Sequence, residues 1–205
     1  MKSLAGERLE QAQLTEDGIV GDRTVHVGGP EGVRTARRQH NLLGLHGILG
    51  ADGVPRVDGH RWDTNAALAL IRAAAGDDAW LATDESLGRF DVLPLLVATD
   101  GAIAAFGRDG RRLRPNLVIA GVVGLDERTW PGAELRIGAA IIRLDSLRPR
   151  CPMTTVDPDT LERDPNVLRD IGRRFRGQLA LNAEVIRPGL VGVGDPVRLV
   201  RMGES

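Results

Sequence analysis

The 205-residue chain contains a single cysteine, Cys151. An internal disulfide is therefore excluded, and the chain by itself has too few thiolates for a four-cysteine zinc or iron–sulfur site. The sequence also lacks any apolar run of the roughly 18 residues that a membrane helix needs, and it has no basic segment followed by an apolar one. We therefore expect neither a membrane span nor a secretion signal, and we predict a cytoplasmic protein.

Aromatic residues are also scarce, because tyrosine is absent and Phe and Trp number three each. The stacking surface that proteins use to bind single-stranded nucleic acid is thus hardly available. Acidic and basic residues nearly balance, at 28 against 27 with a formal net charge of −1. This balance disfavours a broad surface for DNA or RNA. We expect no nucleic-acid partner and no membrane partner, and any anion site must be local.

Lysine occurs once, at Lys2, so nearly all positive charge is carried by arginine. A GC-rich genome that replaces lysine codons by arginine codons explains most of this bias, since a surface charge tolerates either residue. The functional alternative is that arginine forks bind phosphate with two parallel hydrogen bonds.

The 26 glycines fall between short apolar runs, a pattern typical of strands joined by turns. We therefore expect strands to dominate. The predicted strands are Ile19–Val20 leading into Arg23–Val27, then Val92–Thr99, Leu117–Ile119, Glu134–Ile137, Ala140–Leu147, Ala183–Arg187 and Val197–Arg201.

Two segments have helical character. Asp63 can cap an alanine-rich helix over Thr64–Ala75 that stops at Gly76. Pro165–Phe175 places apolar residues at helical spacing. Because no repeat or long linker separates the halves of the chain, we predict a soft boundary near Gly76–Leu87.

Most motifs that carry chemistry are missing. The sequence contains no phosphate-binding P-loop, no glycine-rich dinucleotide fingerprint, no HExxH zinc motif and no GxSxG nucleophile elbow. The four histidines have weak spacing for a metal cluster, and we interpret them as loop residues. They are His26, His40, His46 and His60.

The strongest chemical signal lies around Cys151, which follows a predicted strand. Pro149 and Pro152 stiffen the backbone on either side, so the thiol has a defined direction. Arg148 and Arg150 favour the thiolate, which is the form that binds a metal or accepts sulfur. A lone cysteine is often an inert small hydrophobic residue, but this polar and cationic setting favours a reactive one.

Two further cationic segments stand near glycine or proline. One is Arg111–Leu117, a loop stiffened by proline before an apolar strand, and the other comprises Gly21–Arg23 with Thr35–Arg38. Each alone is typical of a solvated basic loop. Their occurrence together with Cys151 favours a joint function.

Motifs along almost the whole chain resemble those of the MOSC-domain family, named after the carboxy-terminal domain of molybdenum cofactor sulfurase. The family includes the mitochondrial amidoxime-reducing component and bacterial relatives. The matching segments, in the family's order, are Lys2-Ser3, Gly18–Arg23, Thr35–Arg37, Leu93–Leu96 with Thr99-Asp100, Arg114–Asn116, Trp130 with Gly132, Arg150-Cys151, Thr154–Pro158 and Gly194–Val197.

This resemblance implies a mainly β protein with two or three short helices. It further implies an N-terminal MOSC-type β region over residues 1–80, a MOSC β-barrel over residues 81–205, and a molybdopterin-type molybdenum cofactor held between them. Cys151 is then both the molybdenum ligand and the catalytic residue. The implied cofactor-binding residues are Lys2, Ser3, Arg23, Thr35, Arg37, Asp100, Arg114, Asn116, Arg150 and Thr155. A soft thiolate suits the metal, and converging cationic donors suit a phosphate. Pyridoxal phosphate is not expected.

The sequence departs from the family pattern at three places. Relatives have Tyr-Pro-Val before the Lys-Ser pair, whereas this chain starts at Met1-Lys2, which leads to the hypothesis that the true start lies upstream. Leu161 stands where relatives have glycine, which would alter that turn. Gly101 follows Asp100 where relatives often have a serine, so one hydroxyl for a phosphate is missing.

Three functions are open at this point. The first is a molybdenum-dependent oxidoreductase that reduces N-hydroxylated or N- or S-oxygenated small molecules. Its electrons must come from a separate flavin or iron–sulfur reductase, because the chain shows no flavin or nucleotide fingerprint and cannot hold a cluster. The second is a sulfur carrier that forms a persulfide on Cys151, and the third is a non-catalytic module that binds the cofactor.

Overall fold

The computed structural model describes residues 1–83 and 89–201. Its residues group into two compact units, which we call unit 1 and unit 2. Unit 1 comprises Met1–Arg8, Gly21–Asp91 and Val156–Arg163, and unit 2 comprises Leu9–Val20, Val92–Thr155 and Asp164–Ser205. The predicted division at residue 80 stays a prediction, because these units are groups of contacting residues and the chain passes repeatedly from one to the other.

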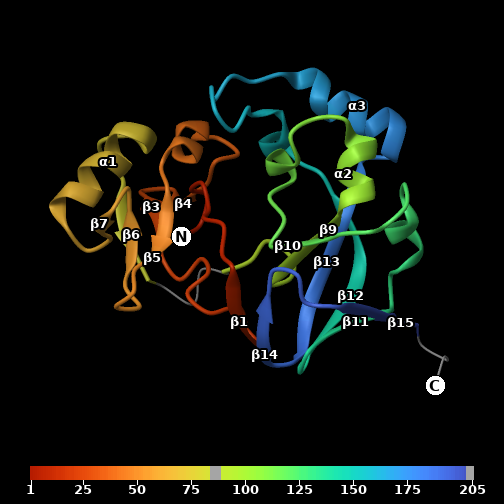
Figure 1. Cartoon of the computed structure of the whole chain (residues 1–205). Coiled ribbons are helices and arrows are strands. Elements are labelled where there is room, and N and C mark those ends of the chain that lie inside the picture. Colours follow the sequence, from red (N-terminus) through yellow and green to blue (C-terminus); the bar gives the residue numbers. More distant parts are fainter. Residues whose placement is uncertain (84–88, 202–205) are drawn as a thin grey trace. The chain divides into compact units, whose positions relative to one another are not determined.

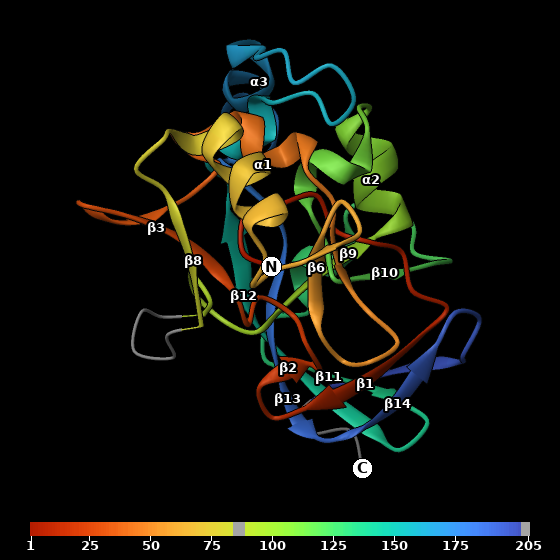
Figure 2. The same ribbon diagram turned by 90° about the vertical axis from the view of Figure 1, so that its left-hand side faces the viewer.

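Unit 2 is built on a curled, six-stranded sheet with the order β10-β9-β13-β12-β11-β15 (Figure 1). Its strands are β9 (Leu95–Thr99), β10 (Leu117–Ile119), β11 (Glu134–Ile137), β12 (Ala140–Pro149), β13 (Gln178–Arg187) and β15 (Val197–Val200). Only β9 and β10 pair in parallel, and the other neighbours are antiparallel. A second sheet in the same unit has the order β14-β1-β2 (Figure 2), from β1 (Gln11–Thr15), β2 (Gly18–Ile19) and β14 (Gly189–Gly192).

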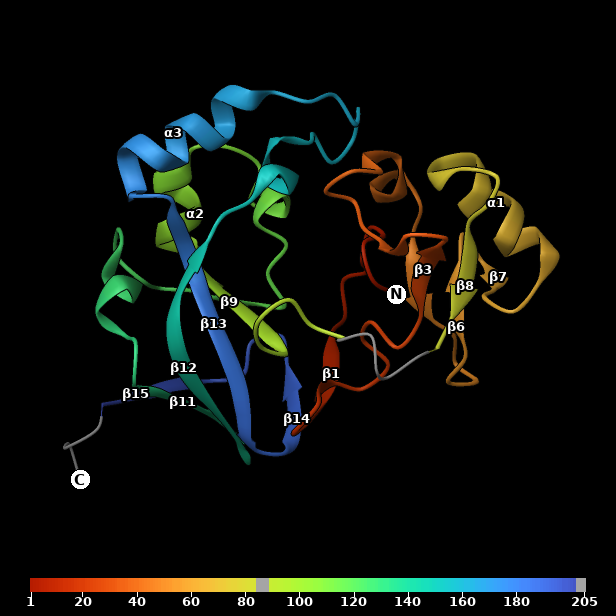
Figure 3. The same cartoon turned by 180° about the vertical axis from the view of Figure 1, so that it is seen from behind.

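Two helices lie side by side at one end of the six-stranded sheet (Figure 3): α2 (Asp100–Phe106) and α3 (Pro165–Phe175). In α3, Asp164 caps the first turn and Pro165 occupies a first-turn position that needs no amide donor. Spacing of four residues puts the buried side chains Val167, Ile171 and Phe175 on one face, where they pack with Phe106, Leu113 and Leu179. This cluster anchors the segments that flank Cys151.

Unit 1 contains two three-stranded sheets and helix α1 (Asn65–Ala75). One sheet has the order β4-β3-β8, and the other has the order β5-β6-β7. Their strands are β3 (His26–Gly29), β4 (Gly32–Arg34), β5 (Gly47–Leu49), β6 (Pro55–Val57), β7 (His60–Arg61) and β8 (Trp80–Ala82).

The expected fold class, mainly β with short helices, is confirmed, and the described residues contain three α-helices. Two details differ. The α1 cap is Thr64, whose hydroxyl accepts the Ala67 amide, whereas the predicted cap Asp63 pairs with Arg61. The predicted strand over Arg23–Val27 starts only at His26, because Arg23 has a left-handed backbone (φ 53°) that a strand does not accommodate. The far end of the predicted boundary, Leu87, lies outside the described residues.

Candidate functional site

Cys151 lies two residues after the end of the long strand β12 and directly before the 3₁₀ turn η5 (Pro152–Thr155). Hydrogen bonds within this segment fix its backbone. The Thr154 amide and hydroxyl both donate to the Cys151 carbonyl, at 3.1 and 2.9 Å, and the Thr155 hydroxyl donates to the Pro152 carbonyl at 2.6 Å. Thr155, predicted as a cofactor contact, therefore uses its hydroxyl inside the turn. The thiol of Cys151 is free and half-buried.

Arg150 directs its guanidinium into the same region. Its Nη2 donates to the Leu113 carbonyl at 2.7 Å, but Nε and Nη1 are buried and have no hydrogen-bond partner. Burial is the main cause that lowers the pKa of Arg150 to about 10; Cys151 opposes this shift, and the nearby Arg148 and Arg114 add to it. A buried cation with two unsatisfied donors is costly by itself, so this geometry fits an anionic or acceptor-rich group.

The second cationic segment reaches the cysteine turn. It begins with the 3₁₀ turn η3 (Gly110–Leu113) and ends at Arg114, which has a left-handed backbone (φ 55°). Arg112 Nη1 donates to the carbonyls of Thr154 and Thr155, at 3.4 and 3.1 Å. The sequence flagged this segment as cationic but did not single out Arg112. Its proximity in sequence to the Arg-Pro-Asn motif was the available signal.

Asn116 is a framework residue of the adjoining strand. Its side-chain oxygen accepts a hydrogen bond from the Leu96 backbone amide at 2.9 Å, and its backbone amide donates to the Leu96 carbonyl at 2.8 Å. These two bonds extend the pairing of β10 with β9 by one residue. The structure thus brings the segments of Arg114, Asn116, Arg150, Cys151 and Thr155 into one unit.

Asp100 has a different environment. Its carboxylate accepts three backbone amides, from Gly121 at 2.7 Å, Gly101 at 2.8 Å and Val122 at 2.9 Å, and these bonds lower the pKa of Asp100. The observed role of Asp100 is to hold the loop after β10, and its role as a cofactor contact stays a prediction.

The missing serine beside Asp100 has a steric explanation. A Cβ atom at Gly101 would lie 2.3 Å from the Val122 carbonyl oxygen and 2.6 Å from that of Gly124. Backbone atoms cannot move aside as a flexible side chain can. A serine at this position is therefore incompatible with the observed loop.

Unit 1 contributes the other predicted residues, beginning with the amino-terminal pair. The Lys2 ammonium lies 3.6 Å from Asp91, and its backbone amide donates to the Val25 carbonyl at 2.9 Å. Ser3 is buried and has a left-handed backbone (φ 70°). Arg23 pairs with Asp22 at 2.5 Å and stacks over the ring of Phe90 at 4.5 Å.

Thr35 and Arg37 line a cavity of about 490 Å³ within unit 1. Arg34 and Arg38 add positive charge to its wall, and the buried Oε1 atom of Gln39 has no hydrogen-bond partner. Arg37 also pairs with Asp91 at 2.6 Å. The structure therefore joins Lys2 and Arg37 through one carboxylate.

Leu161 stands in a turn with a left-handed backbone. Its φ is 61°, a conformation that glycine adopts without strain and that leucine takes at an energetic cost. The expected difference of this turn from that of the family stays a prediction.

The described residues were searched for groups of metal-binding side chains and for helices that could cross a membrane. Within residues 1–83 and 89–201, no group of three or more His, Cys, Asp or Glu side chains is arranged to hold a metal ion. Over the same residues, none of the helices combines the length and apolar character that crossing a membrane requires.

Comparison with known proteins finds similarity over part of the chain. Residues 103–198 match the family model of the MOSC domain. Mitochondrial amidoxime reducing component 2 of Homo sapiens is 37% identical over 76 residues, which cover 34% of this chain and 22% of that protein. The Rattus norvegicus protein of the same name is 47% identical over 47 residues, or 23% of this chain and 13% of that protein. The match thus spans about a fifth or less of these relatives.

Two solved structures are similar at low sequence identity. The YuaD protein from Bacillus subtilis has a TM-score of 0.48 and 12% identity, and the alignment covers 94% of this chain and 86% of that one. YiiM from Geobacillus stearothermophilus has a TM-score of 0.43 and 16% identity, with coverage of 54% and 56%.

Proposed function

We propose that this chain binds a molybdopterin-type molybdenum cofactor through Cys151, because residues 103–198 match the family model of the MOSC domain. The proposed activity is the reduction of N-hydroxylated or N- or S-oxygenated small molecules. The name of the human and rat relatives, amidoxime reducing component, supports this class of substrate.

One observation carries the proposal: Arg150 keeps two buried N–H donors without a partner beside a free, half-buried thiol. A thiolate is a ligand that soft, high-valent metals prefer. The neighbouring guanidinium supplies the fixed donors that an anionic cofactor needs. The residues present therefore fit the group.

The chain's own residues have separable roles in this proposal. Cys151 ligates the metal, and Arg150 donates to acceptor atoms of the cofactor. Arg114 contributes charge, and Asn116 holds its segment in place. In unit 1 the proposed contacts are Lys2, Ser3, Arg23, Thr35 and Arg37.

When bound, the cofactor supplies the two-electron chemistry that, with two protons, converts an N–OH group into N–H and water. Electrons have to be delivered by a separate protein of the flavin or iron–sulfur reductase class, because the lone cysteine cannot hold a cluster. We also propose a cytoplasmic location.

The test uses the natural chain, Cys151→Ser, and Met153→Leu as a matched control that removes the other sulfur atom of the same turn. Each protein is produced in a host that makes the cofactor. Molybdenum content, pterin fluorescence and reduction of an amidoxime are then measured, together with intact mass before and after treatment with a thiol.

We expect molybdenum and pterin in equal amounts in the natural chain and in Met153→Leu. Cys151→Ser should lose metal and amidoxime reduction. Equal metal content and activity in Cys151→Ser would overturn the role of Cys151.

Two alternatives have distinct outcomes in the same experiment. A mass increment on Cys151 that a thiol removes, without pterin, indicates a persulfide carrier, which the cationic surroundings of the thiol would stabilise. Pterin bound equally by all three proteins, without activity, indicates a non-catalytic cofactor-binding module.

A further inference from the structure

The turn that carries Cys151 ends on carbonyl groups that it cannot satisfy by itself. A helical turn leaves its last carbonyls without partners inside the turn. In η5 these include the carbonyls of Thr154 and Thr155. Both residues are buried, so water is a poor substitute for a protein donor.

A side chain from a distant segment supplies the donor. Arg112 Nη1 donates to the Thr155 carbonyl at 3.1 Å and to the Thr154 carbonyl at 3.4 Å. The Asp164 amide adds a bond to the Thr155 carbonyl at 2.9 Å. Cationic side chains at the carbonyl end of a helical turn also interact favourably with its dipole.

The connection runs in both directions. Arg150, next to Cys151, donates through Nη2 to the Leu113 carbonyl at 2.7 Å, and Leu113 directly follows Arg112. Two guanidinium groups thus cross-link η3 and the cysteine segment, one from each side. Leu113 is fully buried in the cluster formed with α2 and α3, so η3 has a fixed position within unit 2.

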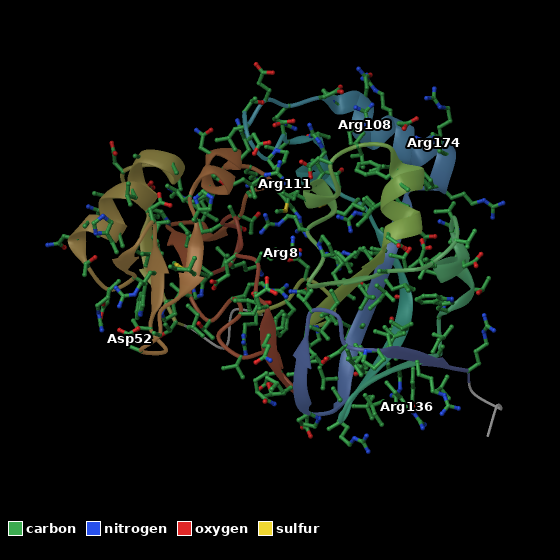
Figure 4. All side chains as sticks on the ribbon, viewed as in Figure 1. Arg8, Asp52, Arg108, Arg111, Arg136 and Arg174 are labelled. Carbon is green, nitrogen blue, oxygen red and sulfur yellow. The ribbon has the colours of Figure 1, made fainter. Side chains whose placement is uncertain are left out.

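The neighbouring arginine, Arg111, has a carboxylate partner close in the sequence. Arg111, labelled in Figure 4, is on the same turn, and its guanidinium pairs at 2.6 Å with Asp109, two residues away in the sequence. Its side chain is largely exposed. Arg111 is therefore a matched control for the removal of one positive charge from η3.

We propose that Arg112 is a positioning residue that holds the turn carrying Cys151 and so fixes the direction of its sulfur. Its use in metal binding rests on the proposed function, but its effect on the turn does not. Loss of Arg112 leaves two buried carbonyls without this donor. The turn should then open more often and expose the half-buried thiol.

The experiment measures the alkylation rate of Cys151 by iodoacetamide in cofactor-free protein, followed by intact mass. The variants are Arg112→Ala, Arg112→Lys and Arg111→Ala, and a thermal unfolding midpoint is recorded for each. Millimolar guanidinium chloride, far below denaturing concentrations, tests whether the missing group can be replaced. Molybdenum content is measured separately on cofactor-loaded samples of the same variants.

Arg112→Ala should alkylate about tenfold faster than the natural chain, since hydrogen bonds from charged groups are stronger than those between neutral groups. Arg112→Lys should fall between the two, because it keeps the charge without the planar fork. Guanidinium should slow Arg112→Ala and leave Arg111→Ala unchanged. Arg111→Ala itself should stay within about twofold of the natural chain, as expected for an exposed pair.

The proposal is overturned if Arg112→Ala alkylates at the natural rate, if Arg111→Ala has an equal effect, or if guanidinium does not slow Arg112→Ala. If Arg112→Ala does not fold, the alkylation rates of Arg112→Lys and Arg111→Lys are compared instead, and only the first should be raised. If Arg112→Ala raises the alkylation rate but neither the natural chain nor any variant binds molybdenum, the proposed function alone is contradicted. If the natural chain binds molybdenum but Arg112→Ala leaves the alkylation rate of Cys151 unchanged, this inference alone is contradicted.

Discussion

The candidate residues of unit 1 and unit 2 differ in what balances their charge. In unit 1, Lys2 and Arg37 share the carboxylate of Asp91, and Arg23 pairs with Asp22. An incoming anion has to compete with these carboxylates. Such partly exposed pairs contribute little to stability and exchange readily.

In unit 2 the guanidinium of Arg150 donates to the uncharged Leu113 carbonyl, and two of its nitrogens remain without a partner. Glu127 is likewise fully buried, with only one of its oxygens bonded, to the Thr99 hydroxyl at 3.3 Å. Burying a charge without a counter-charge costs stability. Unit 2 thus holds buried N–H donors of Arg150 without acceptors, whereas these three cations of unit 1 face carboxylates.

The largest expected effect comes from Arg150→Met, which keeps the side-chain length and removes the charge. We expect cofactor affinity to fall about a hundredfold, because two charged donors are lost. The thermal midpoint of the cofactor-free protein should stay equal or rise, since the buried charge is gone. Molybdenum retention during dialysis and thermal unfolding test both parts.

A matched control for this prediction is Arg136→Met. Arg136 is exposed on β11, and Figure 4 shows it at the opposite end of unit 2 from Arg108 and Arg174. Its substitution should change neither quantity. Full molybdenum retention in Arg150→Met would remove the contrast between the units.

The second prediction concerns pH. Burial raises the pKa of Glu127, while the hydrogen bond from Thr99 opposes this shift. Above the ordinary glutamate value of 4.5 the native state therefore keeps a proton that the unfolded chain has lost. Stability then falls as the pH rises from that value to the pKa of the folded protein, and it levels off above it.

Glu127→Gln mimics the protonated acid and should remove this dependence, so it should be more stable than the natural chain at pH 8. Urea unfolding between pH 4.5 and 8 measures the difference. Glu16→Gln, an exposed position, serves as the control and should parallel the natural chain. A parallel curve for Glu127→Gln would show that its carboxyl group is not the source.

The third prediction concerns the left-handed backbone of Leu161 in unit 1, a conformation that Arg114 adopts in unit 2. Glycine adopts this conformation without the penalty of about 1–2 kcal/mol that other residues have. Leu161→Gly should thus be about 1 kcal/mol more stable than Leu161→Ala in chemical unfolding. At Leu9, which lacks a positive φ, the order of Gly and Ala should reverse. The same order at both positions would exclude strain at Leu161.

The smallest effect is expected for Asp91→Asn, which removes the carboxylate shared by Lys2 and Arg37. Anion affinity should rise by about threefold at most, because exposed ion pairs contribute roughly 0–1 kcal/mol. Cofactor titration at low and moderate salt measures the change. A change in cofactor affinity as large as that of Arg150→Met would mean that the charges of unit 1 contribute as much to binding as Arg150 does.

Elements with strong local signals were predictable. The bounds of β10, β11 and α3 match those expected from apolar runs and helical spacing. The helix α2 was missed, because Thr99-Asp100-Gly101 is typical of a strand end followed by a turn. Its signal was the Thr99 cap, which accepts the Ala102 amide at 3.0 Å. Strand β13 begins at Gln178, five residues before the predicted Ala183, since burial in the sheet outweighs local propensity.

The sequence names the candidate site residues, which as a set stay a prediction, but it does not give the contacts that each residue makes. Motif matching named Cys151 and Arg150 and grouped Asp100 with them. The carboxylate of Asp100, however, accepts hydrogen bonds from three backbone amides. Motif matching also passed over Arg112, whose partners lie 42 and 43 residues away. Hydrogen-bond partners at such separations are set by the packing of the chain.

The sequence by itself determined that this protein has one thiol, a strand-rich chain and the motifs of the MOSC family, because composition and order suffice for each. Only the tertiary structure decided that Arg150 retains buried donors without acceptors and that Arg112 holds the cysteine turn. The physical reason is that burial and hydrogen-bond satisfaction depend on which distant segments meet, and not on the residues that adjoin in sequence.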